Sequence, residues 1–194
     1  MKIRNILLAT IAFLALVGCG GGDYSPKPKA YLRIDLPERA YTLCDTQPLP
    51  FTFECSKAAQ VSIKKRELRD VWVDIAYPQW NGVVFLTYKQ LAGKEDLRGQ
   101  IDTSSRLLEK HYQFASGIDE RGYEDAEHKV YGTVWHLRGS KVASTYQFFA
   151  TDSVRHFLRG ALYINSVPNN DSLAPVLEYM QRDIDHLVET LRWR

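Results

Sequence analysis

The sequence predicts an α+β fold, in which a twisted antiparallel sheet carries an amphipathic C-terminal helix packed on it. Several short stretches alternate between apolar and polar residues, as strands do. Proline, glycine and asparagine separate these stretches, which is typical of turns. The last part of the chain then changes to an apolar period of three to four residues, which indicates a helix that covers one face of a sheet.

The strands are predicted from alternation between defined breaks. Val71–Tyr77 ends at Pro78, and the turn signal Asn81–Gly82 leads into Val83–Tyr88, so these residues predict a hairpin. Further short strands are predicted at Tyr31–Leu36 and Phe51–Cys55. An antiparallel meander is predicted from Gly117–Tyr123, Val130–Leu137, Val142–Ala150 and Val154–Ile164.

Two helices are predicted. Asp102 or Thr103 can cap a helix that runs through Leu108 to His111. The C-terminal helix follows the loop Asn169–Ser172, and its apolar stripe consists of Val176, Leu177, Met180, Ile184, Leu187, Val188 and Leu191. By analogy of element order, an αβα sandwich of the PsbP/Mog1 type is the specific form that we expect.

Residues 1–18 are predicted to be a lipoprotein signal peptide. Lys2 and Arg4 precede an apolar run that ends at Val17. This run of about twelve residues is too short to span a bilayer, which needs ~20. The run ends in a leucine, two small or medium residues and Cys19, an order that resembles the bacterial lipobox. In lipobox proteins the cysteine sulfur takes a diacylglycerol, and the new amine is acylated, for example with palmitate. The alternative is an ordinary secretory signal with an incidental cysteine.

The remaining chain is predicted to form a lipidated flexible tether at residues 19–29 and a single globular domain at residues 30–194. Gly20–Gly22 supplies flexibility, and Pro26 and Pro28 stiffen the segment that follows. Without residues 1–18, 23 basic side chains balance 23 acidic ones. A neutral chain gives no reason to expect a nucleic-acid partner.

Cys44 and Cys55 are the only cysteines besides Cys19. Because an exported chain meets an oxidising compartment, these two residues are predicted to form a disulfide. Closing a loop of about a dozen residues stabilises a fold by ~3 kcal/mol in the chain-entropy model. The alternative is two unrelated thiols, one of them packed in a strand.

No catalytic or metal-binding set is predicted. Ser153 and His156 lie close in sequence, but on an extended strand they point to opposite faces. Asp152 and Ser153 are explained more simply as turn formers. The five histidines have no metal-ligand spacing. We therefore expect no enzyme and no cofactor, and a hydrolase that uses Ser153 or His156 is the least favoured alternative.

Two short segments carry minor predictions. Lys64–Arg66 is predicted to be a solvated loop, and a contact of these basic residues with a membrane surface is the alternative. Asp183 and His186 lie three residues apart on the terminal helix, so they could form a surface hydrogen bond or ion pair of small value.

One strand carries a candidate partner-contact surface. Arginine and aromatic side chains are enriched in protein interfaces. Alternation places four such residues of the last long strand on one face: Arg155, Phe157, Arg159 and Tyr163. In the alternative, the terminal helix covers this face, and the arginines pair at its edge with Glu178 or Asp185.

Six long motifs are distributed along the mature chain: Tyr24–Pro37, Trp72–Pro78, Gln147–Ser153, His156–Tyr163, Asn169–Leu173 and Asp183–Trp193. Together they resemble the gliding motility-associated lipoprotein GldD family of Bacteroidetes. The resemblance implies a non-enzymatic accessory role in gliding motility and type IX protein secretion, with other proteins of that machinery as partners. It also implies a lipid anchor in the cell envelope, with the domain in the periplasm, on either the inner or the outer membrane. The competing hypothesis is a domain that binds a ligand or lipid in an apolar pocket between sheet and helix.

Overall fold

The computed structural model describes residues 34–44 and 49–194. The chain divides into the units Met1–Leu32 and Arg33–Arg194, and the described residues all belong to the second. Cys19 and the predicted tether lie outside the described residues. The predicted strand Tyr31–Leu36 lies partly outside them, and its described residues from Ile34 onward are not part of a strand.

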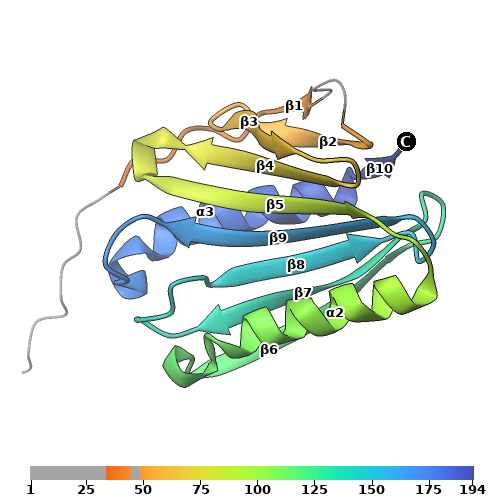
Figure 1. Ribbon diagram of the computed structural model, residues 1–194. Helices are drawn as coiled ribbons and strands as arrows, with labels where there is room; N and C mark the ends of the chain where they lie inside the picture. The colour runs from red at the N-terminus through yellow and green to blue at the C-terminus, as the bar shows by residue number, and fades with distance from the viewer. Residues whose placement is uncertain (1–33, 45–48) are drawn as a thin grey trace, which may run out of the picture. The chain divides into compact units, whose positions relative to one another are not determined.

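A seven-stranded antiparallel sheet forms the centre of the described unit (Figure 1). Its strands are hydrogen-bonded in the order β3-β4-β5-β9-β8-β7-β6. Strands β6 to β9 form the predicted meander, and β9 then pairs with β5, so the meander joins the first hairpin. The strands are β3 Gln60–Arg66, β4 Asp70–Tyr77, β5 Gly82–Gln90, β6 Gly117–Asp125, β7 Val130–Arg138, β8 Tyr146–Thr151 and β9 His156–Ile164.

A small second sheet packs into the same core. It has the order β1-β2-β10, with β1 at Tyr41–Cys44, β2 at Phe51–Ser56 and β10 at Arg192–Trp193. Phe51 and Phe53 of β2 are fully buried, and they belong to the main apolar cluster together with residues of β4, β5 and the C-terminal helix. This small sheet therefore extends the core on one side of the large sheet.

Two helices lie on opposite faces of the large sheet (Figure 1). Helix α2 spans Lys94–Glu109, and helix α3 spans Asn170–Glu189. The predicted apolar stripe of α3 is buried in the main core, so the predicted helix and its packing on the sheet are confirmed. Two short 3-10 turns, η1 at Pro78–Trp80 and η2 at Tyr112–Phe114, follow β4 and α2. The structure is thus the predicted α+β fold.

Strand alternation assigns side chains to the two faces of the large sheet. In β4, Val71, Val73, Ile75 and Tyr77 are buried on the α3 side, and the residues between them point to the other face. On that other face, α2 packs on β7, β8 and β9 through a second apolar cluster. This cluster contains Leu91, Leu108, Trp135, Leu137, Val142, Phe149 and Phe157.

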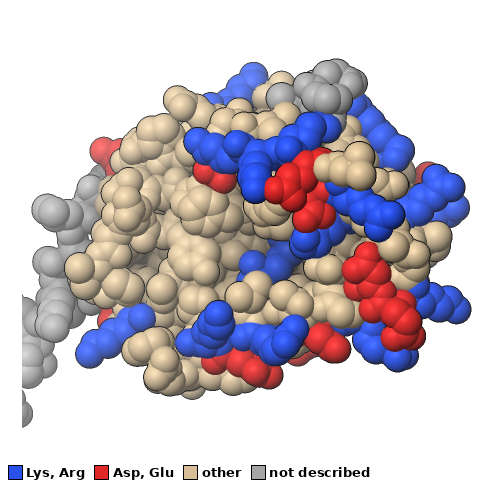
Figure 2. All heavy atoms as spheres, in the orientation of Figure 1, with Lys and Arg blue, Asp and Glu red and all other residues tan. Residues whose placement is uncertain are grey.

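Helix α2 covers only part of its face of the sheet. Its apolar cluster contains no residue of β3, β4 or β5 among the residues that the structure describes. Figure 2 shows a broad uncharged area on this side of the molecule, bordered by basic and acidic side chains. A shallow cavity of about 680 Å³ lies there. We call this area the open face and define it by Asp74, Ala76, Val83, Phe85 and Tyr163.

The structure corrects two predictions of local structure. Lys64–Arg66 is not a loop, because these residues form the end of the edge strand β3. Exposed lysines protect such an edge from pairing with another chain. Helix α2 begins at Lys94, well before the predicted cap at Asp102 or Thr103, and Gly93 precedes it with a φ of 147°.

The hairpin of β4 and β5 is confirmed. Its turn contains Asn81, which adopts a φ of 53°, and Tyr77 pairs with Gly82. An asparagine tolerates this left-handed conformation better than most residues, which explains the turn signal.

Candidate functional site

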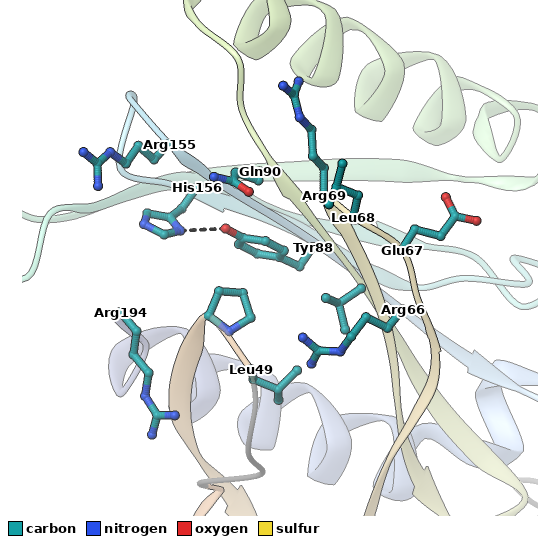
Figure 3. A pocket seen from close by; sticks show the side chains of 12 residues that line it. Leu49, Arg66, Glu67, Leu68, Arg69, Tyr88, Gln90, Arg155, His156 and Arg194 are labelled. Atoms are coloured by element: carbon teal, nitrogen blue, oxygen red, sulfur yellow. Dashed lines mark hydrogen bonds between the residues drawn. The ribbon is translucent and has the colours of Figure 1, made fainter.

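A surface pocket of about 460 Å³ lies at one end of the large sheet (Figure 3). It is lined by segments that are far apart in the sequence. These are the loop before β2, the turn between β3 and β4, the end of β5, the turn before β9, and the C-terminus. The lining residues are Leu49, Pro50, Arg66, Glu67, Leu68, Arg69, Val71, Tyr88, Gln90, Arg155, His156 and Arg194.

Backbone hydrogen bonds join these segments around the pocket. The Gln90 N–H donates to the Arg69 carbonyl at 2.8 Å, and the Leu91 N–H donates to the Arg155 carbonyl at 2.7 Å. The Arg194 N–H donates to the Pro50 carbonyl at 2.9 Å. The pocket wall is therefore part of the hydrogen-bonded framework of both sheets.

The turn between β8 and β9 is built around Asp152. Its Oδ1 accepts the backbone N–H groups of Val154, Arg155 and His156 at 2.8–2.9 Å. Burial raises the pKa of Asp152, but these donors outweigh burial and hold the pKa below its ordinary value. Ser153 has a φ of 66°, a left-handed conformation that belongs to the turn. Asp152 and Ser153 are thus turn formers, as predicted.

Tyr88 and His156 form a buried pair at the centre of the pocket. The Tyr88 hydroxyl lies 2.8 Å from His156 Nδ1, and the imidazole stacks on Trp193 with ring centroids 5.0 Å apart. Burial raises the pKa of Tyr88 to about 12, and the charge of Asp152 adds to this effect. Burial also lowers the pKa of His156, although Asp152 opposes that shift. Both groups are therefore uncharged at neutral pH.

The rim of the pocket is basic. Arg66, Arg69, Arg155 and Arg194 line it, and Figure 3 shows Arg69 and Arg155 extending away from the Tyr88–His156 pair. The single acidic lining residue, Glu67, pairs with Lys65 at 2.5 Å. Such a rim attracts anions, and the apolar side chains of Leu49, Pro50 and Val71 can contact an apolar group beside the anion.

The described residues do not assemble a catalytic dyad from Ser153 and His156. Ser153 is exposed, and no hydrogen bond joins its side chain to the imidazole, which contacts Tyr88 instead. Residues 34–44 and 49–194 also contain no group of three or more histidine, cysteine or acidic side chains that could hold a metal ion.

The four predicted partner-contact residues lie in three different environments. Phe157 is 2% exposed and stacks on Phe149 beneath α2, so it cannot contact a partner in this fold. Arg155 is exposed at the pocket rim. Arg159 and Tyr163 are partly buried on the α2 side of the sheet, where Tyr163 forms part of the open face.

The alternative prediction, in which the terminal helix covers this strand face and the arginines pair with Glu178 or Asp185, is also wrong. The helix that covers this strand face is α2 rather than the terminal helix. Asp185 pairs with Arg121 at 2.6 Å, and Glu178 pairs with Arg182 at 2.6 Å.

Cys44 and Cys55 lie together in the small sheet. Both are buried, and their sulfur atoms are 3.1 Å apart. The contact with Cys44 and burial raise the pKa of the Cys55 thiol. The two cysteines are therefore not unrelated, and the disulfide itself stays a prediction.

Sequence reasoning missed a buried polar cluster on α3. Asp183 is 5% exposed and accepts hydrogen bonds from the hydroxyls of Tyr41 and Tyr77, each at 3.0 Å. His186 contacts Glu54 at 2.7 Å and stacks on Tyr41. The predicted surface interaction between Asp183 and His186 is thus replaced by separate contacts with distant strands.

The fold and the site define an α+β domain with an arginine-lined surface pocket and a partly uncovered sheet face. Among the residues described, no helix is both long and apolar enough to cross a bilayer. A family model for the gliding motility lipoprotein GldD matches residues 21–193, so the chain belongs to this family. No curated protein and no solved structure matches the chain. Family membership supports a gliding-related lipoprotein role and an association with the cell envelope.

Proposed function

We propose that the protein is a lipid-anchored envelope lipoprotein and a non-enzymatic accessory component that supports gliding motility and type IX protein secretion. The observation that carries this proposal is the family match, which covers nearly the whole chain after the predicted signal peptide. The lipid would be attached at Cys19, and the domain would lie in the periplasm.

The structure supports a binding role rather than a chemical step. In the described residues, the imidazole of His156 is occupied by Tyr88 and Trp193, and Ser153 does not contact it. The pocket thus resembles a recognition surface, in which arginines surround an uncharged tyrosine–histidine pair and several apolar side chains.

Deletion of the gene tests this role. We expect the deletion strain to lose surface spreading and the secretion of type IX cargo proteins, and the wild-type gene to restore both. The matched variants are Ser153→Ala and His156→Ala, which should restore spreading and secretion as long as the protein accumulates normally. Unchanged secretion in a clean deletion would contradict the proposed role, and failure of Ser153→Ala alone would favour a hydrolase.

A second candidate function, the binding of an envelope ligand or lipid, is favoured by the arginine-lined pocket. Two cavities lie between the large sheet and α3, and they favour this function less: the one lined by Leu162 and Leu177 encloses only about 10 Å³, and the one of about 410 Å³ has a single arginine, Arg138, in its lining. A ligand would instead enter the surface pocket. Cosedimentation with phosphatidylglycerol vesicles, compared with phosphatidylcholine vesicles, tests this function. Arg69→Gln with Arg155→Gln should abolish a preference for the anionic vesicles, and an unchanged preference would argue against the pocket.

A further inference from the structure

Arg159 is a partly buried cation, and it forms no ion pair with an acidic residue in the part of the chain that the structure describes. It lies on β9 between the part of the sheet that α2 covers and the open face. Its guanidinium donates one hydrogen bond, at 2.6 Å, to the neutral Oε1 of Gln147. No carboxylate of residues 34–44 or 49–194 forms an ion pair with it, and burial lowers its pKa. A charge removed from water without a counter-ion destabilises a fold, so this arrangement needs a reason.

The groups around Arg159 make its surroundings still more suitable for an anion. The Nε2 of Gln147 is buried and has no hydrogen-bond partner among the described residues. His111 lies beside Tyr163, with ring centroids 6.3 Å apart. Burial lowers the pKa of His111, and the charges of Arg159 and Lys110 lower it further. One unsatisfied amide donor and one cation therefore lie next to each other on β8 and β9.

The two carboxylates of β4 on this side of the sheet are already paired. Asp74 lies 3.7 Å from Lys64, and Asp70 lies 2.5 Å from Lys89. Neither carboxylate forms an ion pair with Arg159. The positive charge of Arg159 is thus uncompensated within the described residues.

The open face next to Arg159 is apolar and aromatic. Phe85 is 44% exposed, and it lies against Tyr163 with ring centroids 5.7 Å apart. Val83 and Ala76 continue the surface toward β4. Exposed aromatic side chains beside an arginine are typical of the centre of protein interfaces.

We propose that the open face binds an acidic peptide segment of a partner protein. A carboxylate of the segment would pair with the guanidinium of Arg159, and its apolar side chains would pack on Phe85 and Tyr163. Charge complementarity selects this occupant, since a purely apolar segment would leave Arg159 without a counter-ion. The proposal rests on the chemistry of the face and does not depend on the proposed role in gliding.

A binding assay on the purified mature protein in detergent micelles tests this proposal. The probes are two short fluorescein-labelled peptides, one of alternating phenylalanine and glutamate, the other with glutamine in place of glutamate. Anisotropy is measured against empty micelles. We expect the glutamate peptide to bind about tenfold more tightly, because a charge-assisted bidentate pair is stronger than a neutral hydrogen bond.

Matched variants locate the binding site. Arg159→Gln should remove the preference for glutamate, whereas Arg155→Gln, in the turn just before the same strand, should keep it. Phe85→Ser should weaken the binding of both peptides. Arg159→Lys retains the charge and should retain part of the preference, so it carries the test if Arg159→Gln does not fold. Thermal unfolding of each variant checks the fold.

Several results would overturn the proposal. Equal affinity for the two peptides, or no binding of either at millimolar concentration, would exclude an acidic segment as the occupant. Loss of the preference in Arg155→Gln rather than Arg159→Gln would place the peptide in the arginine-lined pocket. Sedimentation as a dimer that Phe85→Ser disrupts would identify a second copy of the chain as the occupant.

Discussion

Asp183 shows how a single buried residue connects three segments of the fold. It lies on α3 and accepts hydrogen bonds from Tyr41 of β1 and from Tyr77 of β4. The carboxylate therefore joins the C-terminal helix to both sheets. Burial raises the pKa of Asp183, although the two tyrosine hydroxyls oppose this shift.

The raised pKa of Asp183 predicts a pH dependence of stability. Because the folded state favours the protonated carboxyl, the contribution of Asp183 is complete below the ordinary pKa of 3.8 and is lost as pH rises through the raised folded value. Asp183→Asn keeps a neutral hydrogen-bonding group, so it should remove this loss. Urea unfolding between about pH 4 and pH 7 should show a flatter profile for the variant than for the wild type.

The control for this measurement is Glu178→Gln, since Glu178 is exposed and pairs with Arg182 on the same helix. An exposed pair of this kind contributes little to stability. A profile of Asp183→Asn that is identical to that of Glu178→Gln would contradict the assigned role of Asp183.

The cysteine pair predicts an effect of reductant on stability. Oxidation of Cys44 and Cys55 would close a loop between residues 11 apart in sequence. The free energy of unfolding should then fall by about 3 kcal/mol when a reductant is added. Cys44→Ala with Cys55→Ala should be insensitive to the reductant. Alkylation of both thiols in unreduced protein from the envelope would show that no bridge forms.

At the scale of the element, close packing between strands sets strict limits on β7. A Cβ on Gly132 would lie 2.0 Å from the backbone carbonyl oxygen of Phe149 on β8. A backbone atom in the sheet cannot move away without breaking the pairing of Gly132 with Ala150. The glycine is therefore required by the approach of β8.

Gly132→Ala should destabilise the protein by about 3 kcal/mol, as overpacking of a sheet does. Gly122→Ala on the edge strand β6 is the matched control, because nothing lies within 4 Å of a Cβ at that position. The control should change stability by less than about 0.5 kcal/mol. Chemical denaturation of both variants checks the prediction, and equal stabilities would contradict the packing at β7.

Elements with a strong local pattern were predictable from sequence. The β4–β5 hairpin follows from alternation and Asn81, and α3 follows from its apolar stripe. Helix α2 was placed too late, because its first turns bury few apolar side chains and Ser104 fills one of its two fully buried positions. Strand β3 was missed because only Val61 and Ile63 form its apolar face, and the exposed basic residues that follow them do not alternate with apolar ones.

The two candidate surfaces illustrate what sequence could not supply at the scale of the whole molecule. Arg159 and Tyr163 were predicted as surface residues because they lie on one strand. Phe85 belongs to β5, and its position next to them follows only from the pairing of β5 with β9. Similarly, Arg69, Tyr88 and Arg194 meet in the pocket only after both sheets have formed. Local spacing carries no information about contacts between such distant segments.

The whole molecule is proposed to act while held on a membrane, and Cys19 is the residue on which this depends. The described domain has its own core, so loss of the anchor should release a folded domain rather than destroy it. One substitution can therefore remove the lipid anchor and leave the domain folded.

The most direct measurement is complementation of the deletion strain with Cys19→Ser, compared with the wild-type gene at equal protein abundance. Fractionation should find the variant in the soluble fraction, with the thermal unfolding of the wild-type domain. We predict that it restores neither spreading nor secretion of type IX cargo. Full restoration of both by the soluble variant would contradict the account, because function would then not require the membrane anchor.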